Sequence, residues 1–435
     1  MHRFVLFNVR CLWSSPMQRY VAARLYDILL ASIPTLGILW LIDAQVKLGL
    51  VILDASYFSV MVGLTIGVGF LGKPYGKEAG MLEILLAAVA MACWFWGAYN
   101  SGDWLIDIAN RGPEKWLPGA VGLLLLLEAL RRNCGAPIAY LVSGIGLYAF
   151  IGYLFPGSFE AAYVSPDRLI LYFYSDTNGV PGLVIGVGTT IVLGFIVLGA
   201  VMSEVGASEF FTDFAMAIMG HRRGGPAKVA VVASSLFGTI SGSTVGNVMS
   251  TGVITIPLMK RSGFPAHIAA GIEAVASNGG QLAPPVMGTT AFLIAQFLQV
   301  PYSEVVTAAI IPAIIYYLVL FLQVDLIAAR YGLNGLNRDQ LPKLGEVLSK
   351  GWPYIVPLVM LVYLLFWLGF TPGKTAIYSA GLTAVVGLMV QRRLPGLTLL
   401  QSFLRRSGQT LISLLLICAA AGIVIGSLNI SGLGF

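Results

Sequence analysis

Long apolar segments recur along this chain from one end to the other, and they constrain its fold more than any other feature. Hydrophobic residues make up 57% of the 435 residues and charged residues only 11%, whereas soluble domains carry roughly a quarter charged residues. A soluble core cannot hide that much apolar surface, because even large domains leave much of their surface in water. The composition therefore predicts an all-α fold, a polytopic transmembrane helical bundle with the lipid bilayer as its solvent.

Apolar segments near the length of a membrane-crossing helix, about 20 residues, place the spans. They are Leu25–Ile42, Ala55–Leu71, Leu82–Tyr99, Leu117–Leu130, Pro137–Phe155, Gly182–Met202, Val305–Ala329, Tyr354–Phe370, Ile377–Val390 and Leu411–Ile425. The segment from Val229 to Val300 has a different pattern, described below. The spans leave no room for a separate soluble domain.

The positions of Lys and Arg predict the orientation, because short cytoplasmic loops are rich in both. With the N-terminus in the cytoplasm, most of the 26 basic residues lie inside. The basic residues left outside are Lys47, Arg111, Lys115, Arg168 and Lys374. This asymmetry accounts for the net charge of +6 without a nucleic-acid partner. Residues 1–24 lack the small-residue cleavage site of a signal peptide and are predicted to be a cytoplasmic N-terminal segment.

The predicted orientation holds only if the segment between Lys228 and Lys260 enters and leaves the membrane on one side. This segment has about 33 residues, about 50 Å as one helix, which is too long for one span and too short for two. Its middle, Thr239–Asn247, is small and polar. Irregular backbone at membrane depth is tolerated only within protein or beside a watery cavity. We therefore predict a re-entrant hairpin over residues 229–259 with its tip at Ser241–Ser243.

A second interruption follows the hairpin. Ala266–Ser277 has a helical pattern, but Ser277–Pro285 contains two glycines, which loosen the backbone, and two prolines, which lack amide donors. The chain is apolar again up to Val300. The pattern predicts a broken helix over residues 266–300, in which an unwound polar linker joins two short helices near the middle of the membrane.

A hairpin tip beside a broken helix is a device of secondary transporters, in which unwound carbonyls bind sodium and half-helix N-termini face anionic substrate groups. The candidate binding residues with side-chain oxygens are Ser241, Ser243, Thr244, Asn247, Ser277 and Asn278. The candidates that contribute backbone groups or the break itself are Gly242, Gly279, Gly280, Leu282, Ala283, Pro284 and Pro285. Within this set we assign a sodium ion, Na+, to Ser241, Ser243, Asn247, Gly279 and Leu282.

Helix packing is the alternative explanation for these small residues. Gly238, Gly242 and Gly246 have the small-xxx-small spacing that lets helices approach closely. The Gly-Gly and Pro-Pro pairs, taken alone, could mark a plain kink. The two interruptions together, with the constraint on orientation, favour an ion or substrate site.

Glu273 is the one acidic residue well inside this region, and a charge within a membrane is a functional candidate. It lies about two turns from the cytoplasmic end of its predicted helix. The alternative is therefore a partly hydrated salt bridge to Lys260, Arg261 or His267. The sequence leaves both interpretations open.

Other kinds of chemistry lack support in the sequence. Cys11, Cys93, Cys134 and Cys418 are scattered singly, which indicates neither a disulfide framework nor a zinc site. No nucleophile–base pair or cofactor motif indicates an enzyme. The outer loop over residues 156–181 is acidic and rich in tyrosine, so it could dock a soluble partner or be a plain solvated loop. Its run Leu169–Tyr174 is predicted to lie in the membrane plane.

One long segment carries a resemblance to a known family. Gly238–Ala295 has the sequence GTISGSTVGNVMSTGVITIPLMKRSGFPAHIAAGIEAVASNGGQLAPPVMGTTAFLIA. It closely resembles the large membrane subunit of tripartite ATP-independent periplasmic (TRAP) transporters, and most of all the fused permeases of the TAXI-type branch. The similarity extends from about Arg24 to the end of the chain, weakly before Gly182 and strongly over Val229–Pro301. The first four or five spans resemble the small subunit fused ahead of the large one.

The resemblance implies a domain organisation. Residues 25–155 would be small-subunit-like scaffold spans, 156–181 an extracytoplasmic loop, 182–330 the transport core of the first repeat, and 331–435 linking spans and the start of a second repeat. Family members carry two inverted repeats, of which only the first is complete here, so we expect a truncated or split gene product. The loosened segment Gly426–Gly432 resembles the start of the second repeat.

The resemblance also implies a function. The chain would be the membrane permease component of a sodium-driven secondary transporter in a bacterial inner membrane. It would move like an elevator and import a small organic anion delivered by an extracytoplasmic solute-binding protein. The alternative is a secondary carrier or channel-like pore without a binding protein. Sodium is the coupling ion, and no cofactor is expected.

Overall fold

The computed structural model describes residues 16–76, 78–107, 110–337, 339, 341–391 and 397–432, and every regular element in these ranges is a helix. The all-α prediction is therefore confirmed. Some residues used in the sequence interpretation lie outside the described part, namely Arg3, Arg10, Cys11, Lys77, Arg338, Arg392 and Arg393. The same applies to residues 1–15 of the predicted cytoplasmic segment.

Nine helices of the described part are long and apolar enough to cross a membrane. They are Tyr20–Leu41, Asp54–Gly72, Met81–Ile106, Ala136–Leu154, Leu183–Glu204, Tyr302–Arg330, Leu344–Phe366, Pro372–Val390 and Leu400–Ser431. Each overlaps a span predicted from the sequence. The tenth predicted span, Leu117–Leu130, lies within α6 (Pro113–Cys134), which carries charged residues near both ends and is not among the nine. A multi-pass membrane protein is confirmed.

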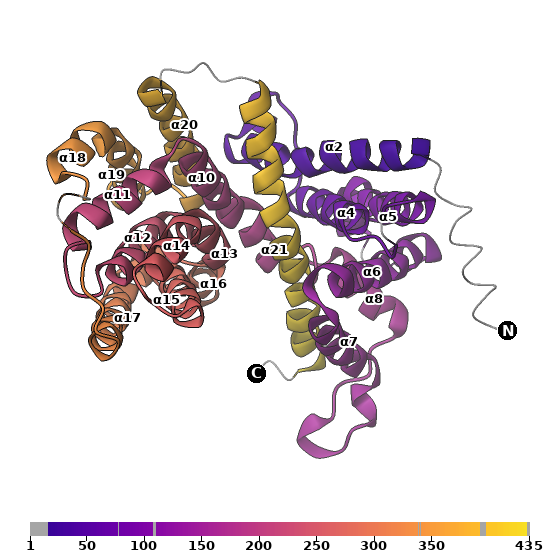
Figure 1. Ribbon diagram of the computed structural model, residues 1–435. Helices are drawn as coiled ribbons and strands as arrows, with labels where there is room; N and C mark the ends of the chain where they lie inside the picture. Colours follow the sequence, from indigo (N-terminus) through magenta and orange to yellow (C-terminus); the bar gives the residue numbers. More distant parts are fainter. Residues whose placement is uncertain are drawn as a thin grey trace. The chain divides into compact units, whose positions relative to one another are not determined.

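The contacts within the chain divide it into two compact units, each described here by itself. One unit comprises residues 1–190 and 404–435, and the other comprises residues 191–403. The helices of the first unit are α2 (Pro16–Leu41), α3 (Ala44–Lys47), α4 (Asp54–Gly72), α5 (Met81–Ile106), α6, α7 (Ala136–Ile151), α8 (Pro166–Ser175), α9 (Leu183–Val187) and most of α21 (Leu397–Ser431). Figure 1 shows them in indigo to purple, with α21 in yellow.

Aromatic residues hold α5, α6 and α8 together in the first unit. Trp94 is fully buried and donates its indole N–H to the Gly122 carbonyl at 3.4 Å. The Trp94 ring therefore fills the interface between α5 and α6. Tyr174 donates its hydroxyl to the Cys93 carbonyl. The predicted run Leu169–Tyr174 forms most of α8, with Leu169, Phe173 and Tyr174 buried.

The last helix differs from its prediction. The segment expected to be loosened from Gly426 onward continues α21 without a break to Ser431. A Cβ added to Gly426 would lie 3.2 Å from the Phe173 ring and from the Asn178 carbonyl oxygen. Close packing at Gly426 therefore keeps a residue of low helix propensity in the helix, since tertiary contacts override propensity.

The second unit contains the predicted hairpin and broken helix. Its remaining helices are α10 (Leu193–Glu204), α11 (Ala207–Met219), α17 (Tyr302–Arg330), α18 (Leu344–Gly351), α19 (Val356–Phe366) and α20 (Pro372–Gln391). The predicted span Tyr354–Phe370 begins earlier in the structure, at α18, and a 3₁₀ turn over Trp352–Ile355 interrupts it. α10 packs against α20 and α12 (Gly225–Ser241), which connects the hairpin to the spans around it.

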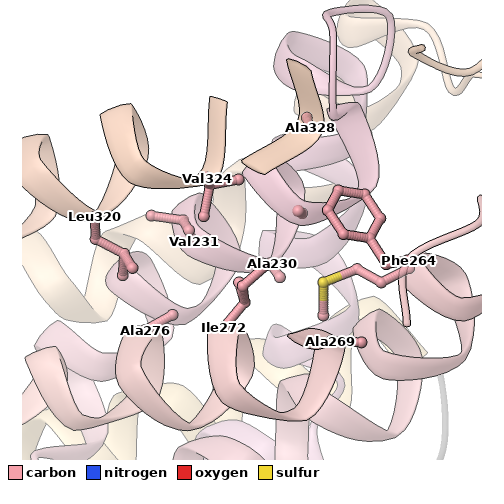
Figure 2. Packing of buried hydrophobic residues seen from close by; sticks show 11 residues of the cluster. Ala230, Val231, Phe264, Ala269, Ile272, Ala276, Leu320, Val324 and Ala328 are labelled. Atoms are coloured by element: carbon pink, nitrogen blue, oxygen red, sulfur yellow. The ribbon is translucent and has the colours of Figure 1, made fainter. Parts of the chain in front are cut away.

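A hydrophobic cluster fixes the hairpin and the first half of the broken helix against α17. It joins Ala230 and Val231 of α12, Ile272 of α15 (Ala266–Asn278), and Leu320 and Val324 of α17. Figure 2 shows these side chains pointing toward one another, with Phe264 beside them. Alanines on the facing surfaces let the three helices approach closely, because small residues drive packing between helices in lipid.

Candidate functional site

The hairpin turns where the sequence predicts. α12 ends at Ser241, Gly242 adopts a left-handed backbone with φ of 56°, and α13 (Thr244–Asn247) begins after Ser243. The Ser243 hydroxyl caps the new helix by accepting the Gly246 N–H at 3.2 Å. A Cβ on Gly242 would lie 2.0 Å from the Met287 carbonyl oxygen. Glycine is therefore required both by the φ angle and by the close approach.

The returning arm contains one irregular turn. A π-helical turn, η4 (Val248–Gly252), separates α13 from α14 (Val253–Arg261). Such turns are frequent at functional sites because they re-aim side chains on a helix. Here the turn carries Thr251, which faces Glu273 as described below.

The broken helix is also present. α15 ends at Asn278, a 3₁₀ turn η5 (Gly279–Gln281) follows, and helical structure resumes only with α16 (Thr289–Leu298). The unwound stretch between them contains Pro284 and Pro285, which are joined by a cis peptide bond. The interruption reaches Gly288, slightly beyond the Pro285 that the sequence predicts.

The hairpin and the unwound stretch are in direct backbone contact. Val286 donates its N–H to the Thr239 carbonyl at 3.2 Å. A Cβ built on Gly238 would lie 2.6 Å from the Cα of Gly280. The two irregular segments predicted separately are therefore one packed assembly, and paired glycines allow the close approach. The helix-packing interpretation of Gly238 is thus confirmed alongside the unwinding.

A polar group, here named the tip group, joins the hairpin tip to the unwound stretch. Thr244 donates its hydroxyl to the Asn278 amide oxygen at 3.2 Å, and it accepts a hydrogen bond from the Gln281 amide at 2.9 Å. These contacts are exposed at the surface of the unit. They place two predicted residues, Thr244 and Asn278, in one polar site.

The residues assigned to sodium lie in different surroundings. The Ser241 hydroxyl is buried and has no hydrogen-bond partner among the described residues, so its oxygen is free to bind a ligand. The Gly279 carbonyl already accepts the N–H groups of Leu282 and Ala283 at 3.0 Å. Leu282 itself is 44% exposed. The Ser241 oxygen fits a cation site best, because a buried polar atom without a partner is costly.

Asn247 is fully buried, and its side chain hydrogen-bonds to two other helices. Its amide N–H groups reach the Ser234 carbonyl at 2.8 Å and the Ser277 carbonyl at 3.5 Å. Thr251 also lies within 3.3 Å of its amide oxygen. Asn247 therefore ties together both arms of the hairpin and α15.

Glu273 lies at the centre of a buried hydroxyl cluster. Its Oε1 accepts hydrogen bonds from Ser234 at 3.0 Å, Thr251 at 2.6 Å and Ser277 at 3.2 Å, and its Oε2 accepts one from Thr255 at 2.6 Å. All five side chains are fully buried. No ion pair in the described part of the chain involves Glu273, and the expected alternative with Lys260, Arg261 or His267 is not formed. We call these five residues the Glu273 cluster.

Sequence reasoning missed four of the residues at these sites. Ser234, Thr251 and Thr255 surround Glu273, and Gln281 completes the tip group. Asn247, Thr251 and Thr255 are spaced four apart, so the periodicity of one polar helix face could have identified the two threonines. Ser234 carried no such signal, because only the folded hairpin brings α12 beside α15.

A cluster of charged residues joins the start of α12 to the end of α17. Asp325 forms ion pairs with Arg223 and with Lys228, the latter at 2.5 Å. The hydrogen bond that Arg223 donates to the Asp325 carboxylate raises the pKa of the Arg223 guanidinium above its ordinary value. Lys228 is buried and also lies over the Phe321 ring, with its Nζ 5.0 Å from the ring centroid.

A helical hairpin docked on a broken helix, within a chain of many membrane-spanning helices, defines a membrane protein of the secondary-transporter class. Comparison with known families gives the particular group. The family model for the tripartite ATP-independent periplasmic transporter, DctM component, matches residues 121–435. The chain belongs to this family, and the resemblance to the TRAP large membrane subunit is confirmed.

Curated relatives agree with this membership. The chain is 31% identical to the C4-dicarboxylate TRAP transporter large permease protein DctM of Pseudomonas aeruginosa over 227 residues. These 227 residues are 52% of this chain and 52% of that protein. It is 24% identical over 228 residues to the 2,3-diketo-L-gulonate TRAP transporter large permease protein YiaN of Escherichia coli, covering 52% of this chain and 53% of that one. The sialic acid TRAP transporter permease protein SiaT of Haemophilus influenzae is 26% identical over 209 residues, 48% of this chain and 33% of the relative.

The length of these matches limits which properties of the relatives can be inferred for this chain. The chain spans about half the length of the first curated relatives it matches. The relatives are named as transporter permeases rather than enzymes, which agrees with the prediction that this chain is not an enzyme.

Proposed function

We propose that this chain is the membrane permease component of a sodium-driven secondary transporter in a bacterial inner membrane. It imports a small organic anion that an extracytoplasmic solute-binding protein delivers. The observation that carries the proposal is the hairpin, which turns at Gly242–Ser243 and packs by its backbone against the unwound stretch after α15.

The cation part of the proposal rests on the chemistry of the donors. Sodium prefers oxygen ligands, and the docked segments present serine, threonine and asparagine oxygens close to unwound backbone. The buried Ser241 hydroxyl, which lacks a partner among the described residues, is the strongest single candidate ligand. When bound, sodium supplies the positive charge that offsets an organic anion in a low-dielectric site.

The chain's own part is to couple ion binding to the hairpin. The tip group bridges Thr244 on the hairpin to Asn278 and Gln281 beside the break. Any ligand that holds these segments together stabilises the docked hairpin, and the docked hairpin binds that ligand more tightly. By linkage, ion and anion then raise each other's affinity by the same factor.

The substrate class is proposed from the relatives. Their names specify C4-dicarboxylate, 2,3-diketo-L-gulonate and sialic acid, each of which carries a carboxylate. We propose a carboxylate for this chain as well. An N-terminal orientation toward the cytoplasm follows from the positions of the basic residues.

The decisive experiment is uptake by membrane vesicles from cells that express this gene together with a binding-protein gene of the same genome. Labelled C4-dicarboxylate, sugar acid and sialic acid are the probes. We expect uptake of one class, saturable in sodium and dependent on the binding protein. Uptake without the binding protein would favour a carrier or channel-like pore, and uptake independent of sodium would overturn the coupling.

A further inference from the structure

We propose that the π-helical turn η3 (Gly188–Val192) is a hinge about which the two compact units of the chain move relative to one another. The hinge itself does not depend on the proposed function, whereas its role in transport rests on it. The backbone would change shape at this turn as the second unit, with its hairpin and unwound stretch, changes position.

The first argument is the place of η3 in the chain. The first unit ends at Thr190 and the second begins at Ile191, so the chain passes from one unit to the other inside this turn. The turn joins α9 directly to α10 within one membrane span, Leu183–Glu204. The chain returns to the first unit at Leu404, near the start of α21. Any change in the relative position of the units must therefore be absorbed at these two places.

The second argument is the sequence of the turn. Residues 189–192 read Thr-Thr-Ile-Val, four successive β-branched side chains, which lower helix propensity because their χ1 angles are restricted. The Thr189 hydroxyl donates back to the Ile185 carbonyl at 2.8 Å. The Thr190 hydroxyl donates back to the Gly186 carbonyl at 2.6 Å. Such back-bonding bends helices, and sharp kinks occur at π-helical turns. Bending at η3 therefore costs less than bending of the regular helix on either side.

The third argument is that each end of the turn is packed firmly, and the N-terminal end packs on the first unit. Tyr57 of α4 donates its hydroxyl to the Thr189 carbonyl at 3.0 Å. The Tyr57 ring is itself stacked on Trp40 of α2, with the ring centroids 4.1 Å apart. A Cβ on Gly188 would lie 3.0 Å from the Cys418 Sγ in α21. Contacts with α4 and α21 therefore fix the chain as far as Thr189.

The C-terminal end of the turn packs on the second unit. A Cβ on Gly194 would lie 2.9 Å from the Gly373 carbonyl oxygen at the start of α20. The Phe195 ring stacks on Phe292 of α16, with the ring centroids 5.3 Å apart. The few residues between Thr189 and Gly194 thus join two fixed ends, and hinges are short segments of this kind that absorb the backbone rotation.

The other π-helical turn, η4, provides a contrast. Both of its ends belong to the second unit, and Thr251 within it hydrogen-bonds to Glu273. η4 therefore shapes the packed site, whereas η3 lies where the packing partners of the chain change.

Motion at η3 would reach the candidate site through α10. A Cβ on Gly199 would lie 3.4 Å from the Ser241 Cα, so α10 touches the hairpin where α12 ends. The Phe292 ring that stacks on α10 belongs to α16, which follows the unwound stretch. A rotation at η3 therefore carries the hairpin, the unwound stretch and the buried Ser241 hydroxyl together.

Distances between pairs of spin labels, measured by double electron–electron resonance on the purified chain in lipid, test the hinge. The pair between units is Lys47→Cys in the first unit and Ser349→Cys in the second, both at exposed positions. The control pair, Thr307→Cys and Ser349→Cys, lies within the second unit. Cys418 is kept, because it is buried beside Gly188. The other thiols are removed by Cys11→Ala, Cys93→Ala and Cys134→Ala.

Deletion of Thr190 is the main variant. A π-helical turn holds one residue more than an α-helical turn, so the deletion restores α-helical bonding and leaves the packed faces on both sides in place. We expect several distances between the units in the wild type and one narrow distance in the deletion variant. The control pair should give one unchanged distance in both. A single narrow distance between the units of the wild type, or equal widths in the two proteins, would overturn the hinge.

Thr190→Val replaces the deletion if that variant does not fold. It removes the hydrogen bond to the Gly186 carbonyl and keeps the shape of the side chain. The matched control is Thr212→Val, which removes the same kind of bond, to the Ser208 carbonyl at 2.9 Å, from the regular helix α11. Only Thr190→Val should narrow the distances between the units. No narrowing in Thr190→Val, or equal narrowing in Thr212→Val, would contradict the hinge.

Uptake separates the hinge from the proposed function. With labelled C4-dicarboxylate, sodium and the binding protein, the deletion variant should lose uptake, because its units no longer change position. Uptake retained in a variant whose distances had narrowed would remove the hinge from the transport cycle. If the wild-type chain transported nothing, the proposed function would fail, and the spin-label distances would still decide the hinge.

Discussion

Buried hydroxyls of the hairpin divide into those that have partners and those that do not. Ser234, Thr251 and Thr255 all hydrogen-bond to Glu273. Ser241 has no partner in the described part of the chain, although it lies only two turns further along the same helix as Ser234. A fold optimised for stability alone would not leave such a group, because native structures pair nearly all buried polar atoms.

Ser241→Ala is therefore expected to change function more than stability. It removes a buried hydroxyl that makes no internal hydrogen bond, so the free energy of unfolding should not fall, because an unsatisfied buried polar atom is costly. The sodium concentration for half-maximal uptake should rise about tenfold, which is the loss of one ligand worth about 1.4 kcal/mol.

Ser235→Ala is the matched control for this test. Ser235 lies on the same helix, and its hydroxyl donates to the carbonyl of Val232 at 2.8 Å within that helix. Its sodium dependence should stay at the wild-type value. Equal sodium dependence in the Ser241 and Ser235 variants would remove Ser241 from the proposed site.

At the scale of elements, close contact between glycines decides how the hairpin docks. Gly238 of α12 crosses Gly280 of η5 so closely that a side chain on either would meet the other backbone. This contact forms only when both segments are folded and correctly placed. The close contact is a better explanation of the clustered small residues than a simple kink.

Gly238→Ala is expected to lower the thermal midpoint of the purified protein by the equivalent of about 1–3 kcal/mol, the usual effect of overpacking. The added Cβ would lie 2.6 Å from the Gly280 Cα, so the backbone must move apart. Gly271→Ala is the control, because nothing lies within 4 Å of a Cβ there. That variant should be neutral or slightly stabilising, since alanine favours a helix. Similar midpoints for the two variants would contradict the close crossing.

The ion pairs of Asp325 hold α12 against α17 at their shared end. Asp325→Asn is expected to lower the thermal midpoint, because it leaves the buried Lys228 ammonium without its carboxylate. The matched control is Glu346→Gln, which removes an exposed pair with Lys343 at 3.7 Å. Exposed pairs contribute little, so this control should melt like the wild type. A midpoint for Asp325→Asn no lower than that of the control would show the pair to be dispensable.

At the scale of the whole molecule, the predicted membrane orientation holds only if the hairpin enters and leaves the membrane on the same side. Single cysteines in a background without the native cysteines, labelled by an impermeant maleimide on intact cells, test this. Arg222→Cys and Ser262→Cys, at the two ends of the hairpin, should both be protected. Gln299→Cys, after α16, should be labelled.

One labelling pattern would contradict the predicted orientation. If Ser262→Cys were labelled from outside while Arg222→Cys stayed protected, the hairpin would be a simple crossing and every later loop would be inverted. Permeabilised cells, in which all three cysteines react, control for burial of the thiol.

Much of the fold could be predicted because its cause is local. Span positions follow from apolar runs, and the turn at Gly242–Ser243 and the break after Asn278 follow from glycine, proline and small polar residues. Burial of Trp94 and the unbroken helix at Gly426 could not be predicted, because each depends on what packs against it. In both cases a partner far away in the sequence outweighed the local preference.

The sequence by itself determined that the backbone leaves helical geometry twice within a membrane-spanning chain, since this depends on which residues can make helical hydrogen bonds. Only the tertiary structure decided that the two interruptions pack on one another. It also decided that Glu273 is enclosed by hydroxyls from both arms of the hairpin rather than by the cations nearest to it in the sequence. The physical reason is that a buried carboxyl is controlled by the donors within a few ångströms of it, and those are assembled only when the helices meet.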